Sequence, residues 1–206
     1  MKKRKVFILA AVCFLMTGLA GIANAQTPVN FGLKGGLNFA NISGSDADSE
    51  IRTGFTGGIS LDISVPGPLG IESGAFYSQK GAEFSEDGSE GTLSLDYIEV
   101  PVLAKVGFGP PGPASPHIIL GPYVGFNVSA ESEVSGGGFT FSGDISDDVN
   151  DTEFGGIAGL GIDLNLGLTK LNAQARYGMG FTNIFTEDGD EEIKNSVISI
   201  VVGIQF

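Results

Sequence analysis

The last ten residues, Val197 to Phe206, constrain the fold of this chain more than any other segment. Counting back from Phe206 in steps of two gives an unbroken apolar row: Ile204, Val202, Ile200 and Ile198. Residues two apart share one face of a β-strand, so this segment predicts a strand with one fully apolar side that ends on an aromatic residue. Such a strand suits the wall of a β-barrel that has lipid outside and polar groups inside.

The beginning of the chain predicts export. A basic stretch, Met1 to Lys5, precedes an apolar run from Val6 to about Ile22, and Ala23-Asn24-Ala25 then fits a small-x-small cleavage site. We therefore expect a signal peptide at residues 1–25 and a single mature domain at residues 26–206, beginning at Gln26. The alternative is a membrane-anchor helix, but the run is short and ends at a clear cleavage site. Cys13 lies inside the run, which argues against a lipid anchor.

Charge excludes several classes of partner. Four of the eleven basic residues lie in the predicted signal peptide, so the mature chain has 7 basic and 24 acidic residues, a net charge of 7 − 24 = −17. A chain this acidic is unsuited to nucleic acid or to anionic lipid headgroups. After residue 25 no apolar stretch is long enough for a membrane-spanning helix. A protein that crosses the membrane without helices must use a closed barrel.

Period-two alternation recurs in eight segments, each with an apolar row opposite polar residues. The apolar rows run from Phe31 to Phe39, Phe55 to Ile63, Leu69 to Tyr77, Ile98 to Val106, Ile118 to Val128, Phe154 to Leu166, Leu171 to Phe181 and Ile198 to Phe206. Each segment is long enough to cross a bilayer as a tilted strand.

The connections between these segments alternate in length and chemistry. Short Gly/Pro turns are predicted at residues 65–68, 109–113 and 167–169, whereas the other connections are longer, and the longest runs from about Ser129 to Thr152. Of the 24 acidic residues, 19 lie in or beside the long connections. We predict an all-β fold: an eight-stranded antiparallel up-and-down transmembrane β-barrel with short periplasmic turns and longer acidic outer loops.

Aromatic residues of the apolar rows gather at the two ends of the predicted strands, as they do at lipid headgroups. Those near the loops are Phe39, Phe55, Tyr77, Phe126, Phe154 and Phe181, and those near the turns are Phe31, Phe108 and Phe206.

Four segments resemble a known family. They are Phe31 to Asn41, Gly74 to Gly81 (GAFYSQKG), Asp96 to Lys105 (DYIEVPVLAK) and Ala175 to Ile184 (ARYGMGFTNI). Together they resemble, in order, the small barrels typified by the PorT proteins of Bacteroidetes-type bacteria. The resemblance implies an outer-membrane β-barrel of about eight strands. It fixes no activity, although named members of that family contribute to secretion.

The polar faces predict a network of charges inside the barrel. An eight-stranded barrel is only wide enough for its own side chains, and buried charges need partners. The inward-facing charged residues are Lys34, Arg52, Asp62, Glu72, Lys80, Glu99, Lys105, Asp163, Lys170 and Arg176. The alternative is that the same groups line a narrow ion-conducting path.

Metal binding and catalysis have weaker signals. Asp144, Asp147, Asp148 and Asp151 offer oxygen ligands for a weak Ca²⁺ or Mg²⁺ site, although their spacing differs from that of an EF-hand. The alternative is a solvated acidic loop. The only histidine, His117, has no identifiable catalytic partners, so we expect no catalytic residue and no cofactor.

These observations predict a monomeric, non-enzymatic outer-membrane barrel with a structural or surface-interaction role, and the resemblance adds a secretion-accessory role. Its expected partners are outer-membrane lipid and, through the C-terminal strand Ile198 to Phe206, the barrel-assembly machinery. No protein partner can be named. Two alternatives remain open: a narrow porin-like channel for small solutes, and an exported soluble, lipocalin-like barrel that binds an apolar ligand inside.

Overall fold

The computed structural model describes residues 29–44, 49–65, 67–86, 89–109, 112–137, 139–186 and 192–206. The predicted signal peptide and its cleavage site lie outside these ranges. The strands are β1 (Val29–Ser43), β2 (Ser49–Glu50), β3 (Arg52–Ser64), β4 (Leu69–Glu86), β5 (Ser89–Gly107), β6 (Ala114–Gly136), β7 (Phe139–Asp144), β8 (Thr152–Asn165), β9 (Lys170–Gly180) and β10 (Lys194–Gln205). Within the described ranges, no helix has the length and apolar character needed to span a bilayer.

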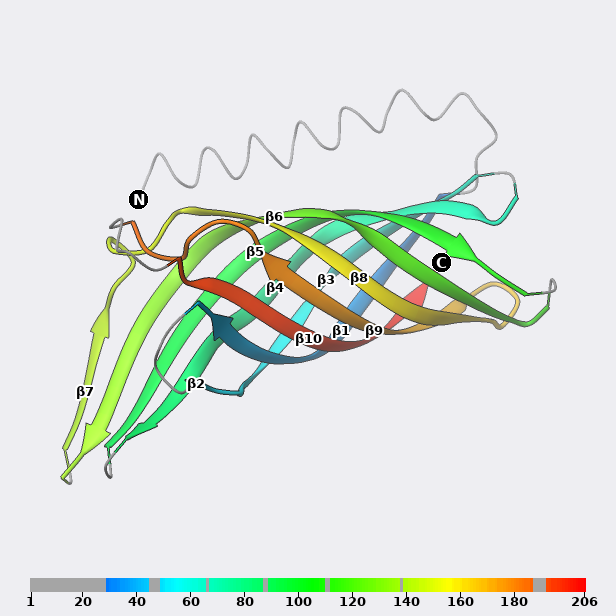
Figure 1. Cartoon of the computed structure of the whole chain (residues 1–206). Coiled ribbons are helices and arrows are strands. Elements are labelled where there is room, and N and C mark those ends of the chain that lie inside the picture. Colours follow the sequence, from blue (N-terminus) through cyan, green and yellow to red (C-terminus); the bar gives the residue numbers. More distant parts are fainter. Residues whose placement is uncertain are drawn as a thin grey trace.

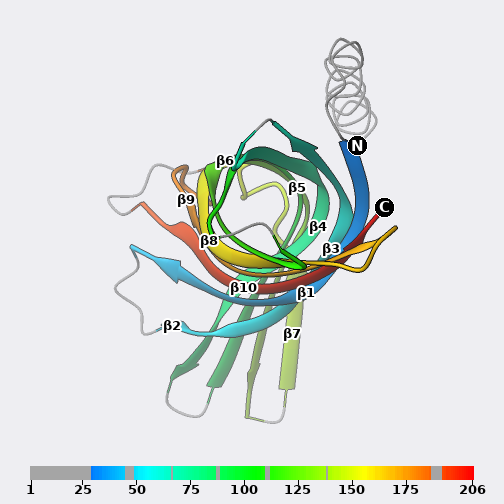
Figure 2. The same ribbon diagram turned by 90° about the vertical axis from the view of Figure 1, so that its right-hand side faces the viewer.

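Eight of these strands form a closed antiparallel ring, which confirms the predicted fold class. The ring runs β1, β3, β4, β5, β6, β8, β9, β10, and the pairing of β10 with β1 closes it. Each ring strand pairs with the next in sequence order, so the topology is up-and-down (Figures 1 and 2). The short strands β2 and β7 pair with β4 and β6, outside the ring.

The C-terminal strand closes the barrel at the predicted position. The Phe206 backbone N–H donates to the Phe31 carbonyl at 2.8 Å, and the Phe31 N–H donates back to Phe206 at 3.2 Å. Ile198, Ile200, Val202 and Phe206 are all exposed on the outside of the barrel, whereas Gln205 is buried inside. The apolar row read from the sequence is therefore the outer surface of β10.

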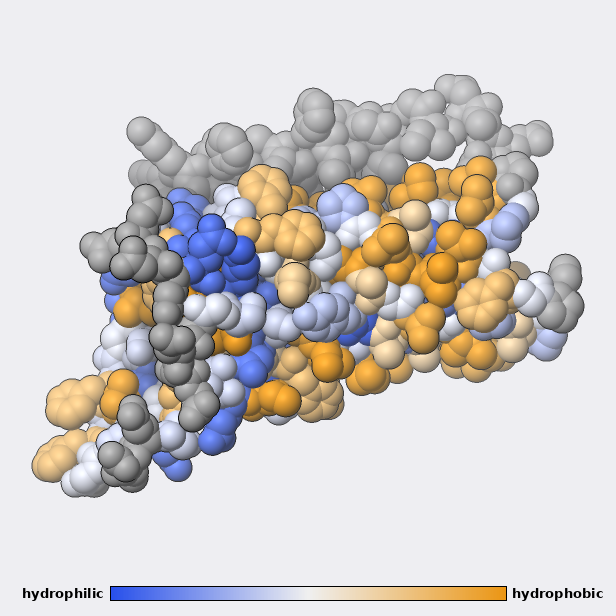
Figure 3. All heavy atoms as spheres, in the orientation of Figure 1, coloured by the Kyte–Doolittle hydropathy of each residue, from blue (hydrophilic) through white to orange (hydrophobic). Residues whose placement is uncertain are grey.

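The outside of the ring is a continuous apolar surface. Every ring strand contributes at least one exposed large apolar side chain, among them Leu33, Phe55, Leu69, Val102, Leu120, Leu160, Tyr177 and Val202. Figure 3 shows such side chains gathered over the barrel wall on the face in view. Leu61 and Ile63 of β3 are exceptions: they alternate in step with Phe55, yet each is only 8% exposed. An apolar exterior around charged residues is the reverse of the lipocalin-like alternative.

The short turns lie where the sequence predicted them, at the end of the barrel that we call the turn end. The Val65 N–H donates to the Leu69 carbonyl, and the Leu166 N–H donates to Thr169. Gly67 and Gly167 adopt φ values of +94° and +89°, which residues with a Cβ rarely adopt. Pro66, Pro110 and Pro111 of the predicted turns lie outside the described residues.

Two of the predicted long loops are largely strand instead. β4 and β5 continue as far as Glu86 and Ser89, and β6 continues to Gly136 and pairs with β7. Residues 129–144 were expected to be loop because they are polar, but Ser, Thr and Glu there still alternate with apolar residues and pair through the backbone. We call residues 81–86, 89–94, 131–136 and 139–144 the extension. It flares away from the barrel axis at the end opposite the turns (Figures 1 and 2).

Candidate functional site

The first part of the interior is centred on Glu72 of β4, whose side chain is fully buried. Lys34 Nζ lies 2.7 Å from Glu72 Oε2, and Arg176 Nη2 lies 2.7 Å from Glu72 Oε1. Gln174 Nε2 also donates to Oε2 at 2.8 Å. Strands β1 and β9 thus supply two cations and an amide to the one carboxylate of β4, which compensates the cost of burying its charge.

A second centre lies nearer the turn end, where Lys105 of β5 joins two carboxylates. Its Nζ lies 3.1 Å from Asp62 Oδ1 and 2.7 Å from Asp163 Oδ2. Gln205 donates to Asp62 at 2.7 Å, and Asn172 donates to Asp163 at 2.6 Å.

Weaker contacts link this centre to the first. Lys34 Nζ is 3.9 Å from Asp62 Oδ2, and His117 Nδ1 is 4.0 Å from Asp163 Oδ2. On the other side of the His117 ring, Nε2 lies 3.3 Å from the Gln174 amide nitrogen. Because Gln174 also donates to Glu72, the polar contacts run without a break from one centre to the other.

A third centre lies toward the extension end and surrounds Lys80 of β4. Its ammonium lies 2.5 Å from Glu99 and 3.0 Å from Glu153, and it also donates to the Tyr123 hydroxyl at 3.2 Å. The rings of Tyr97 and Tyr123 lie 5.1 and 4.5 Å from the ammonium, within the range of cation–π attraction. Two carboxylates and two aromatic rings therefore enclose a single cation.

Beyond Lys80, an apolar cluster fills the extension end of the interior. Val149 and Ile184, from the two long connections β7–β8 and β9–β10, are 2% and 3% exposed. They belong to one cluster with Ile42, Ala82, Leu93, Leu95, Tyr97 and Ala130. Backbone hydrogen bonds hold the two connections together, since the Asn150 N–H donates to the Ile184 carbonyl at 2.8 Å. We call this group the apolar seal.

The turn end is open in comparison. A cavity of about 510 Å³ lies there, and its lining includes Asp62, Lys105, His117, Asp163 and Lys170. The next cavity inward, between the Glu72 and Lys80 centres, holds only about 30 Å³. That volume is about enough for one water molecule, so the open space narrows sharply within the barrel.

Most of the predicted interior residues meet in these three centres. Eight of the ten form ion pairs there: Lys34, Asp62, Glu72, Lys80, Glu99, Lys105, Asp163 and Arg176. Arg52 contacts the Lys80 centre only through the backbone, since its Nη1 donates to the Lys80 carbonyl at 2.7 Å. Lys170 lies beside the turn-end cavity.

Several interior residues were missed by sequence reasoning. Glu153 was counted with the acidic loops, yet it is 3% exposed and accepts hydrogen bonds from Lys80 and Tyr123. It shares its alternation with Asp163 on the same strand, which was the available signal. The amides Asn172, Gln174 and Gln205 are neutral, so a search for charge pairs passed over their roles.

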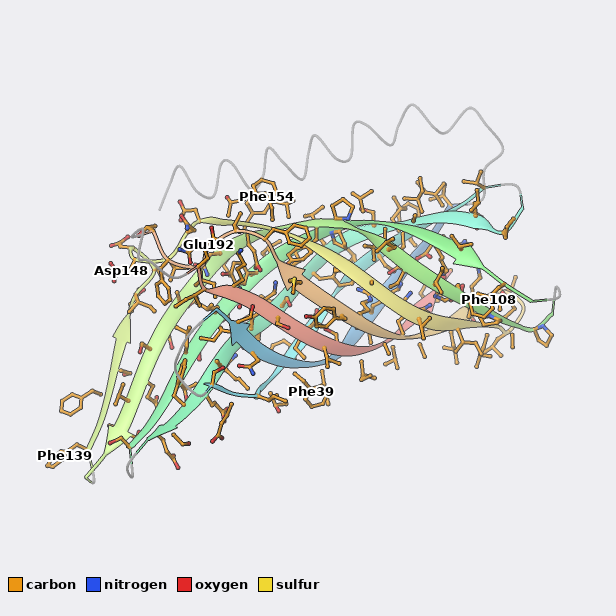
Figure 4. All side chains as sticks on the ribbon, viewed as in Figure 1. Phe39, Phe108, Phe139, Asp148, Phe154 and Glu192 are labelled. Carbon is orange, nitrogen blue, oxygen red and sulfur yellow. The ribbon has the colours of Figure 1, made fainter. Side chains whose placement is uncertain are left out.

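The acidic residues proposed for a metal do not gather. Among the described residues, which include Asp144, Asp147, Asp148 and Asp151, no group of three acidic, histidine or cysteine side chains is placed to hold a metal ion. Asp144 Oδ1 instead accepts a hydrogen bond from the Ser146 N–H at 2.8 Å. Figure 4 shows Asp148 at the extension end, on the same side of the barrel as Glu192.

A family profile agrees with this architecture. Solved structures similar to this chain include Neisserial surface protein A (16% identity, 85% of this chain and 97% of that chain, TM-score 0.48), Ail of Yersinia pestis (15%, 86% and 98%, 0.41) and OprG of Pseudomonas aeruginosa (14%, 87% and 97%, 0.48). No curated protein sequence matches the chain. Residues 24–186 match the profile of the family described as outer membrane protein beta-barrel domain. Since that match spans most of the sequence, the chain belongs to the outer-membrane β-barrel domain family and is an outer-membrane protein.

Proposed function

We propose that this protein is a closed, non-enzymatic barrel whose role is to hold the extension at the cell surface, where it contacts other molecules. The observation that carries the proposal is the filled interior. Beyond the turn-end cavity, the interior is occupied by the barrel's own side chains and leaves no through-path for a solute, so the working surface is what the barrel exposes beyond the membrane.

Two features oppose the channel alternative. Around Lys80, four side chains contact one ammonium, and a solute could pass only if those ion pairs broke inside the barrel. Beyond that centre, the side chains of the apolar seal are hydrocarbon apart from the Tyr97 hydroxyl, and one hydroxyl cannot replace the hydration shell of an ion.

Planar-bilayer recording tests this proposal. Refolded protein should insert without steady conductance, because the Lys80 centre and the apolar seal block the path. The double variant Lys80→Ser/Tyr123→Ser removes the central side chains and should show brief openings, whereas the surface control Glu90→Gln should behave as the unaltered protein does. Steady conductance by the unaltered protein would refute the closed-barrel proposal.

The resemblance to the PorT proteins supports a narrower assignment to that group and, with it, a contribution to protein secretion. Secretion by a strain that lacks this gene, with and without a restored copy, tests that role. We also propose that residues 1–25 are removed on export, that the mature chain is a monomer, and that the assembly machinery recognises β10. N-terminal sequencing of the outer-membrane form should begin at Gln26.

A further inference from the structure

The extension has two chemically different faces because its four strands are in register. One row across the sheet is Phe84, Gly91, Val134 and Phe141, and the row at the tip is Glu86, Ser89, Gly136 and Phe139, so the exposed apolar side chains of this side gather toward β6 and β7. Val134, Phe139 and Phe141 are 51%, 71% and 73% exposed. We call this side, which continues the barrel interior, the apolar face. Figure 4 shows Phe139 at the tip, far from Phe108 at the turn end.

The opposite face is polar and acidic. Its rows are Gly81, Ser94, Glu131 and Asp144; then Glu83, Thr92, Glu133 and Ser142; then Ser85, Glu90, Ser135 and Thr140. The sequence has no lysine or arginine between residues 81 and 104, or between 106 and 169. No basic residue of the extension itself can therefore neutralise its acidic residues.

One edge of the extension is open. β7 pairs with β6, and no other described strand pairs with β7. All six of its residues are exposed. An edge strand presents a row of backbone donors and acceptors that can pair with another chain, and natural proteins usually protect such edges with lysine, proline or a covering segment. β7 contains neither lysine nor proline.

We propose that the extension binds an extended polypeptide segment of a partner protein that pairs along β7 and alternates apolar with basic residues. The apolar side chains of the segment would continue the row formed by Phe141 and Val134. Its lysine or arginine side chains would lie on the opposite face, in line with the two rows that contain Glu131 and Glu133 of β6. Backbone pairing supplies the affinity, and the alternating side chains supply the specificity. This inference rests on the proposed function and names the class of partner.

The acidic charge of the extension favours a basic segment over two other occupants, a second copy of this chain and a lipid surface. Pairing of β7 with β7 of a second copy would extend two acidic faces side by side, and like charges at close range are destabilising. An outer leaflet that carries phosphate groups is also anionic, so the acidic face disfavours a lipid surface. A basic segment is the one of the three that the charge favours.

Synthetic peptides test the proposal on the full mature protein, refolded in detergent. The probe is a capped peptide of about eight residues that alternates Val and Lys, compared with a Val–Glu peptide and a Ser–Lys peptide of equal length. We expect the Val–Lys peptide to bind about tenfold or more tightly than either of the others. Phe139→Ser/Phe141→Ser should weaken that binding by about tenfold or more, because it removes the apolar face at the edge.

Matched variants separate specific pairing from general attraction. Phe108→Ser, at the turn end, should leave binding unchanged, and Glu131→Lys/Glu133→Lys should reverse the preference toward the Val–Glu peptide. N-methylation of alternate peptide bonds should abolish binding if the backbone pairs with β7. Equal binding of the Val–Lys and Ser–Lys peptides, or full binding by the Phe139/Phe141 variant, would overturn the proposal.

The proposed function can fail separately from this inference. Conductance recorded on the same preparation tests the closed-barrel proposal independently of peptide binding. Failure of a folded, non-conducting barrel to bind the Val–Lys peptide would overturn the inference alone. Folding of each variant is checked by its change in gel migration on heating.

Discussion

Replacing Glu72 by Gln should weaken the barrel more than almost any other single change of charge. The side chain keeps its shape, but Lys34 and Arg176, each 2.7 Å from the Glu72 carboxylate, lose the charge that compensates them. Lys34 retains only the more distant Asp62, at 3.9 Å. Removing one partner of a buried ion pair costs about 3–5 kcal/mol, and we expect Glu72→Gln to lower the free energy of unfolding by that amount.

Urea titration of the protein in lipid vesicles measures this effect. The chain has no tryptophan, so unfolding is followed by far-UV circular dichroism and by the heat-dependent gel shift. Glu90→Gln, an exposed change of the same chemistry, is the control and should stay within about 0.5 kcal/mol. The double variant Glu72→Gln/Arg176→Gln removes one charge of each sign and should recover part of the loss. If Glu72→Gln cost no more than Glu90→Gln, the ion-pair account of the interior would be wrong.

Three further changes test other parts of the structure. Deleting Phe206 removes two backbone hydrogen bonds at the closing seam and should reduce the heat-modifiable fraction in outer membranes more than Phe206→Ala does, since the alanine variant retains them. Lys80→Met leaves Glu99 and Glu153 without a cation inside the barrel and should cost about 3–5 kcal/mol by urea titration; a cost below about 1 kcal/mol would contradict the buried ion pairs. Gly161→Ala places a Cβ 2.4 Å from the His117 ring and should lower the free energy of unfolding by about 1–3 kcal/mol. Gly143→Ala adds its Cβ in open space and should cost almost nothing. Equal urea midpoints for the two variants would contradict the tight packing at Gly161.

The barrel wall could be predicted from the sequence because lipid imposes a strict rule on it. The row from Ile198 to Phe206 must stay apolar throughout, and this alternation gave the strand, its outer face and its position beside β1. The short turns were equally visible, since Gly67 and Gly167 need a conformation that glycine adopts readily.

The extension could not be predicted in the same way. There the alternation is between Ser, Thr or Glu and a few apolar residues such as Val134 and Phe141, and a polar composition was taken as evidence for loop. Backbone pairing rather than burial maintains the strand at that point. A bulge in the pairing of β5 and β6, next to Tyr97, also shifts the alternation and hides the continuity of β6.

The sequence predicted that the interior is charged, but it did not predict which residues form ion pairs. Inward-facing charges followed from the alternation, yet which cation meets which carboxylate depends on register and strand tilt. Lys80 and Glu153, for example, lie 73 positions apart in sequence and come from β4 and β8, which are not neighbours in the ring. Single-sequence reasoning has no measure of that tilt, so it could not group the charges into three centres.

Labelling of cysteines on intact cells tests the central claim, a barrel that holds the extension outside, most directly. The natural cysteine, Cys13, is the only one in the chain and lies in the predicted signal peptide, so single-cysteine variants carry no background after export. A membrane-impermeant maleimide should label Thr140→Cys on intact cells and should label Leu168→Cys, in an exposed turn, only after the outer membrane is permeabilised. Labelling of Leu168→Cys on intact cells, with Thr140→Cys protected, would contradict the account.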